Sequence, residues 1–105
     1  MTDELDWIRP VGAHEGRRFW SPSVGEVLVG RVVDRRTVSM RFGPFEVLVV
    51  ETDGGERHEI NCGHASLREW LSIDDPVPGD VVGIRYDGQP EGHGKRHTYS
   101  AGVRQ

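Results

Sequence analysis

The feature that most constrains the fold of this chain is a long run of β-forming residues from Val24 to Val47, with two glycines ahead of a short loop. Gly25 and Gly30 lie five residues apart in its first half, and a short loop at residues 42–44 leads directly into the next β-rich segment. Glycine weakens the interior of a strand, so Gly30 predicts a bulge or a bend. A long bent strand that returns as a hairpin is the expected start of a small five-stranded barrel.

The remaining periodicity predicts further strands and one helix. We expect strands over residues 24–40, 45–52, 56–62, 81–86 and 97–103. Between the third and fourth strands, Leu67, Trp70 and Leu71 stand at positions i, i+3 and i+4, which predicts one short amphipathic helix that stops before Pro76. The expected fold is therefore all-β, a five-stranded barrel with a single helix that closes one end.

The first 22 residues differ from the rest because prolines and glycines break any regular pattern. This irregular arm contains Trp7 and Trp20, and two tryptophans are costly to leave in water, so we expect the arm to pack onto the barrel. Residues 17–20, Arg-Arg-Phe-Trp, also fit a nucleic-acid platform, although a strap that seals one barrel end is the favoured interpretation. We divide the chain into the arm, residues 1–22, and one domain, residues 23–105.

Charge and cysteine content limit the partners and the compartment. The 105 residues carry a net charge of −4, of which residues 1–16 contribute −3, so the remainder is close to neutral and not a strongly basic clamp. Cys62 is the single cysteine, which excludes an intrachain disulfide. The acidic start lacks the features of a secretory signal, and no apolar run reaches the ~18–20 residues of a membrane span. We expect a cytoplasmic protein without a membrane partner.

Two short motifs resemble those of known proteins. Gly25, Val27, Gly30 and Val32, followed by the Phe-Gly-x-Phe motif of residues 42–45, resemble the opening of OB-fold nucleic-acid-binding domains. Residues 78–88, Pro-Gly-Asp-Val-Val-Gly-Ile-x-Tyr-x-Gly, resemble the fourth strand of small single-stranded-DNA-binding-like OB proteins of actinobacteria and of their phages and plasmids. The resemblance covers about residues 24–104 and implies an OB-type barrel. An SH3-like barrel is the main alternative.

Signatures of catalysis and of metal binding are weak in this chain. The sequence has no nucleophile elbow, no phosphate-binding loop and no His-Glu-x-x-His motif, so we predict no enzyme activity and no cofactor. His58, Cys62 and His64 come closest to a metal-ligand pattern, but a zinc site needs three or four converging ligands. Cys62 is better explained as a small core residue, and no metal site is predicted.

Basic and aromatic residues gather in the two loops that wall the ligand groove of an OB barrel, namely the loops between strands 1 and 2 and between strands 4 and 5. Single strands are held by basic groups along the phosphates and by rings on which bases stack. The candidate residues for binding nucleic acid are Arg35, Arg36, Arg41, Phe42, Phe45, Lys95, Arg96, His97 and Tyr99. Phe45 fits the core equally well, and Tyr86 fits the core better than a platform.

These observations lead to two hypotheses. The first is non-catalytic binding of single-stranded nucleic acid, with DNA preferred, between the two loops. The second is an OB-fold protein-interaction module, an accessory or inhibitory subunit, which the net negative charge and the acidic arm favour. Glutamates at positions 46, 51, 56 and 59 could make the surface of the second and third strands acidic and repel phosphate.

Overall fold

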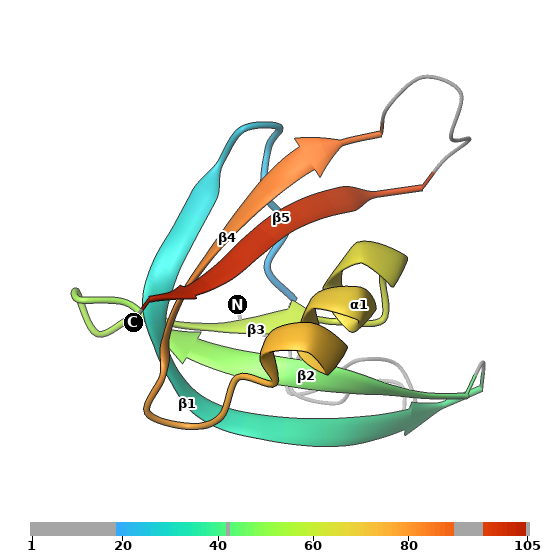
Figure 1. Ribbon diagram of the computed structural model, residues 1–105, viewed down its shortest axis with the longest axis horizontal. Coiled ribbons are helices and arrows are strands. Elements are labelled where there is room, and N and C mark those ends of the chain that lie inside the picture. Colours follow the sequence, from blue (N-terminus) through green and yellow to red (C-terminus); the bar gives the residue numbers. More distant parts are fainter. Residues whose placement is uncertain (1–18, 42, 90–95, 105) are drawn as a thin grey trace, which may run out of the picture.

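The computed structural model describes residues 19–41, 43–89 and 96–104, and its regular part is one antiparallel sheet with one helix (Figure 1). The elements are β1 (Val27–Met40), β2 (Gly43–Glu51), β3 (Arg57–Asn61), α1 (Ala65–Asp74), β4 (Val81–Gly88) and β5 (Thr98–Arg104). All neighbouring strands are antiparallel, in the order β3-β2-β1-β4-β5. The predicted element order is therefore confirmed, with strand ends that differ by a few residues.

The sheet is not closed, because β3 and β5 form its two edges and do not pair. The four described residues of the arm, 19–22, lie along the β3 edge. Phe19 forms a parallel bridge with Glu59, and the Trp20 amide donates to the Glu59 carbonyl at 2.7 Å. The Trp20 ring then reaches Tyr99 of β5, with ring centroids 6.4 Å apart. We call residues 19–22 the strap. The gap between β3 and β5, which the strap spans, is called the β3–β5 seam.

Gly30 lies where β1 passes from one partner strand to the other. The N-terminal half of β1 pairs with β4, its C-terminal half pairs with β2, and the two overlap at Arg31. A Cβ on Gly30 would lie 2.7 Å from Cγ1 of Val50 and would also overlap the Glu51 carbonyl. The register shift in β1 comes later, between Val32 and Asp34. Of the bulge or bend predicted at Gly30, the bulge lies about three residues later, and the glycine itself allows the close approach of β1 to β2 where β1 changes partner strands.

The core lies between the concave face of the sheet and α1, which stands beside β5 (Figure 1). The predicted apolar side of the helix is buried, since Leu67, Trp70 and Leu71 are exposed by only 0, 7 and 4%. The helix ends at Asp74, and the left-handed backbone of the C-cap residue Asp75 (φ 45°) turns the chain before Pro76. The other core residues are Leu28, Val32, Leu48, Val50, Ile60, Cys62, Val82 and Ile84. Within the described ranges, no helix has the length and apolar character that crossing a membrane requires.

Candidate functional site

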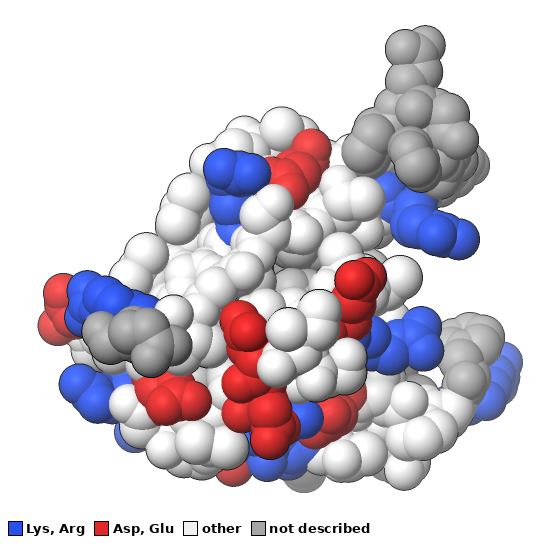
Figure 2. All heavy atoms as spheres, in the orientation of Figure 1, with Lys and Arg blue, Asp and Glu red and all other residues white. Residues whose placement is uncertain are grey.

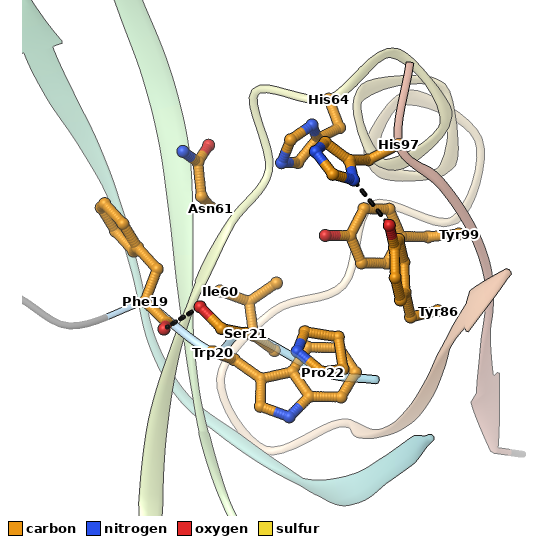
Figure 3. A pocket seen from close by; sticks show the side chains of 10 residues that line it. All are labelled: Phe19, Trp20, Ser21, Pro22, Ile60, Asn61, His64, Tyr86, His97 and Tyr99. Atoms are coloured by element: carbon orange, nitrogen blue, oxygen red, sulfur yellow. Dashed lines mark hydrogen bonds between the residues drawn. The ribbon is translucent and has the colours of Figure 1, made fainter. Parts of the chain in front are cut away.

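A recess lined by aromatic rings opens at the β3–β5 seam (Figure 3). Its volume is about 240 Å³, and its walls come from the strap, from the end of β3, from the residue before α1 and from the facing ends of β4 and β5. The lining residues are Phe19, Trp20, Ser21, Pro22, Ile60, Asn61, His64, Tyr86, His97 and Tyr99. Six of these ten side chains are rings of Phe, Trp, Tyr or His, so the recess offers flat π-surfaces to a ligand.

Four of the rings form one connected cluster. Tyr86 lies 5.1 Å from Tyr99 and 5.7 Å from His97, measured between ring centroids, and all of these pairs are tilted. His64 lies 5.3 Å from Tyr99 and meets His97 edge to face at 5.4 Å. A hydrogen bond of 2.7 Å joins the Tyr86 hydroxyl to Nδ1 of His97. The contacts fix the rings relative to one another, which favours a preformed binding surface.

The local structure explains why these rings meet. Tyr86 and Tyr99 are direct cross-strand partners in the β4–β5 ladder, and Tyr86 continues the inward side of Val82 and Ile84. Because the sheet is open, this last inward position faces the recess. His64 is the N-cap residue of α1, but its side chain makes no capping hydrogen bond, and its ring turns toward His97 instead.

The recess is lined without carboxylates, ammonium groups or guanidinium groups. No Asp, Glu, Lys or Arg side chain is found among the described residues that line it. Burial, followed by the neighbouring His97, lowers the pKa of His64, so its imidazole is neutral at neutral pH. Burial also raises the pKa of Tyr99, which keeps its phenol protonated. A neutral, ring-lined recess suits the flat face of a base better than a phosphate group.

The predicted site residues of β1 are held in ion pairs. Arg35 binds both carboxylate oxygens of Glu46, at 2.8 and 2.9 Å, and it also contacts Asp75 at 2.7 Å. These bonds raise the pKa of Arg35, although desolvation by burial opposes them. The main role of Arg35 is therefore structural. Arg36 pairs with Asp34 at 3.5 Å and with Glu59 at 3.7 Å.

The other predicted residues fall into three groups. Arg41 and Arg96 are exposed near the ends of the β1–β2 and β4–β5 connections, and neither forms an ion pair with another described residue. Phe45 is half-buried against Phe19, with ring centroids 6.0 Å apart, and does not line the recess. His97 and Tyr99 do line it. The remaining two, Phe42 and Lys95, lie outside the described residues.

The carboxylates that were expected to make the surface of β2 and β3 acidic are largely paired with arginines. Glu46 binds Arg35, Glu51 binds Arg57 at 2.9 Å, and Glu59 lies 3.7 Å from Arg36. Asp87 of β4 similarly binds Ser100 and Arg85, whose bonds lower its pKa. In Figure 2, basic side chains stand at two projecting ends on the right of the view, with a hollow between them, while acidic and basic groups intermix below. The acidic residues of β2–β3 are thus mostly neutralised in place.

Eight of the ten residues that line the recess were absent from the predicted site, and three of them supply rings of the cluster or of its wall, namely Tyr86, Trp20 and His64. Tyr86 was assigned to the core. Its side chain does lie on the inward side of β4, but at the open end of the sheet this side faces the recess. Trp20 was expected to pack onto a barrel. It packs against the core beside the open sheet, and its ring also forms part of the recess. His64 was considered only as part of the weak metal-ligand pattern with His58 and Cys62, and its place before the helix did not indicate the recess.

Neither a metal cluster nor an activated thiol is found in the described part of the chain. No three His, Cys, Asp or Glu side chains there converge in a way that could hold a metal ion. Cys62 is fully buried, and burial raises its pKa to about 12, which makes it a poor nucleophile. The rings and polar groups of the recess can stack against a planar ligand and form hydrogen bonds with it.

Comparison of the chain with protein-family models, with curated proteins and with solved structures gave no match. The function is accordingly argued from the site itself.

Proposed function

We propose that the protein binds single-stranded nucleic acid without catalysis, and that this nucleic acid is DNA. The strand would run between the β1–β2 and β4–β5 connections and across the recess. The observation that carries this proposal is the ring cluster at the β3–β5 seam. Proteins that hold single strands combine aromatic rings with basic groups that follow the backbone, and each stacked base contributes about 1–3 kcal/mol. Here Trp20, Tyr86 and Tyr99 supply rings, and Arg96 immediately precedes His97 at the rim.

The architecture is compatible with this assignment. An open five-stranded sheet with a helix between its third and fourth strands fits a partly open OB barrel, the fold class that binds oligonucleotides on one face. The ion pairs of Glu46, Glu51 and Glu59 also reduce the repulsion that a strand would meet on β2 and β3. A cytoplasmic location, where nucleic acid is accessible, is part of the proposal.

The first test is a fluorescence-anisotropy titration with labelled oligothymidine at two salt concentrations. Each phosphate neutralised on a single strand adds about 0.7 to the slope of log affinity against log salt. Replacing Arg41 and Arg96 together with alanine should therefore weaken binding and lower that slope by about 1.4, the sum of two such contacts.

The matched control replaces Arg57 and Arg104 with alanine. This variant loses the same charge, but the two residues stand at the other ends of β3 and β5, away from the recess. It should keep a slope close to that of the wild type. Equal slope changes in both double variants would mean that only net charge matters, and the proposed path of the strand would then be wrong.

A second candidate function, docking to a protein partner, has its own observation. On the outer side of β1, Val27 and Val29 are 55 and 52% exposed, and Val24 just before the strand is 72% exposed. Next to Val29 in the sheet lies Gly83, whose partner in β5 is Gly102, so this surface is flat as well as apolar. If the wild-type protein shows no salt-dependent binding of oligonucleotides at micromolar concentration, this interaction role replaces the first.

A further inference from the structure

Two histidines meet at one end of the recess from different parts of the fold. His64 stands directly before α1 and His97 directly before β5, and their rings lie edge to face with centroids 5.4 Å apart. Figure 3 shows the two rings side by side. Imidazole is the side chain that ordinarily changes its charge between about pH 5 and pH 8. The charge of the recess can therefore change with pH.

The groups around the two imidazoles leave a positive charge without a partner in the described part of the protein. Tyr86 of β4 is bonded to Nδ1 of His97 at 2.7 Å, and Tyr99 of β5 lies against His64 with ring centroids 5.3 Å apart. Phenols titrate only near about pH 10 and supply no negative charge below it. No Asp or Glu is found among the described residues that line the recess. An imidazolium formed here must therefore find its counter-charge in a ligand.

The pair accepts one proton more readily than two. Burial and then the neighbouring His97 lower the pKa of His64, and two imidazolium rings at this separation would repel each other. Two guanidinium groups add to that repulsion. Arg96 precedes His97 in the chain, and Arg68 on the first turn of α1 donates its Nε hydrogen to the Gly63 carbonyl at 3.2 Å, beside His64. We therefore expect a single added charge at mildly acidic pH.

We propose that the His64–His97 pair carries one proton in the complex with a strand at mildly acidic pH, so that the protein binds single-stranded DNA more tightly as the pH falls from about 7.5 to about 5.5. The phosphates of the strand supply the counter-charge that the recess lacks. The sign follows from linkage, because a complex that holds more protons than its free components gains stability as the pH falls. The inference rests on the proposed function, since it specifies how binding at the same site is regulated.

The first experiment is the fluorescence-anisotropy titration with oligothymidine at about pH 7.5 and about pH 5.5, each at two salt concentrations. Thymine has no group that titrates in this range, and phosphodiesters stay singly charged, so a response to pH comes from the protein. We expect severalfold tighter binding at the lower pH. The slope of log affinity against log salt should become steeper by about 0.7, the effect of one added phosphate contact. An increase near 1.4 would overturn the single proton.

Replacing both histidines, His64→Gln with His97→Gln, should remove the response to pH, because glutamine keeps polar groups but does not titrate. His58→Gln is the control. His58 is an imidazole of β3 that lies opposite Val50 in the sheet and does not line the recess. This variant should keep the full response. A response that survives in the double variant, or that is lost in the His58 variant, would overturn the assignment to the pair.

Isothermal titration calorimetry of the wild type measures the proton directly and does not depend on any variant that must fold. Titrations in two buffers of different ionisation enthalpy should show a net uptake of protons on binding, below one per chain, between the same two pH values. Release of protons, or none exchanged, would overturn this inference. If oligothymidine binds equally at both pH values, only this inference falls. If it binds at neither pH, the proposed function falls as well.

Discussion

At the scale of single residues, the contacts of Gly30 show why side-chain size is restricted where one strand serves two partners. The C-terminal half of β1 pairs with β2 and its N-terminal half with β4, and Gly30 lies at the crossing. At this point the Val50 side chain and the Glu51 backbone occupy the space that a Cβ would need. The backbone of β2 cannot move away without breaking its own ladder with β3.

Gly30→Ala should accordingly destabilise the protein by about 1–3 kcal/mol, the usual effect of overpacking a tight site. The measurement is the free energy of unfolding in urea. Gly102→Ala is the control, because a Cβ at Gly102 has no other atom within 4 Å. Its effect should stay within about 0.5 kcal/mol of the wild type. Equal losses in the two variants would show that strand propensity, and not close approach, explains Gly30.

At the scale of elements, one arginine connects three parts of the fold. Arg35 of β1 binds Glu46 of β2, and it also binds Asp75 and the Pro76 carbonyl at the end of α1. Its side chain is only 20% exposed, which makes this network more than a loose surface pair. Arg35 therefore ties the helix end to the β1–β2 hairpin.

This network predicts a dependence of stability on acid. The pKa of Glu46 is lowered below its ordinary value of 4.5, mainly because the carboxylate accepts hydrogen bonds from Arg35. A carboxylate with a lowered pKa in the folded state stabilises the protein fully above its unfolded pKa, and this contribution is lost as the pH falls through the folded value. The free energy of unfolding should thus decrease on acidification below about pH 4.5, and less steeply in Glu46→Gln.

Urea titrations of the wild type and of Glu46→Gln across that acid range measure the difference. Glu56→Gln is a suitable control, because Glu56 is exposed in the turn before β3 and has no ion pair with the described residues. Parallel curves for the wild type and Glu46→Gln would contradict a stabilising role for the Arg35–Glu46 pair.

Regular elements were predictable from the sequence because each has a local pattern. The spacing of Leu67, Trp70 and Leu71 marks the buried side of α1, and the alternation in β3 places Ile60 and Cys62 inside. The strap and the seam have no such pattern, because the bridge between Phe19 and Glu59 joins segments that are far apart in the chain. The predicted site consequently contained two residues of the recess, His97 and Tyr99, and missed the strap and the helix start.

At the scale of the whole molecule, the open sheet determines where function can lie. The β3–β5 seam is the place where pairing stops, and the strap covers part of it while leaving a recess of about 240 Å³. The rings gather at this seam, whereas Arg35 and Arg36 of β1 are engaged in ion pairs. Rings inside the recess and exposed arginines near the two connections support the proposed binding of single strands, because proteins of that kind combine both features.

The most direct test of this account is to record amide proton–nitrogen correlation spectra of the isotope-labelled protein during a titration with oligothymidine. If the strand lies across the recess, the shifts should be concentrated at the seam, in residues such as Trp20, Asn61, His64 and Tyr99. Shifts that are absent at high protein and ligand concentration, or that gather on the outer side of β1 around Val27 and Val29, would contradict it.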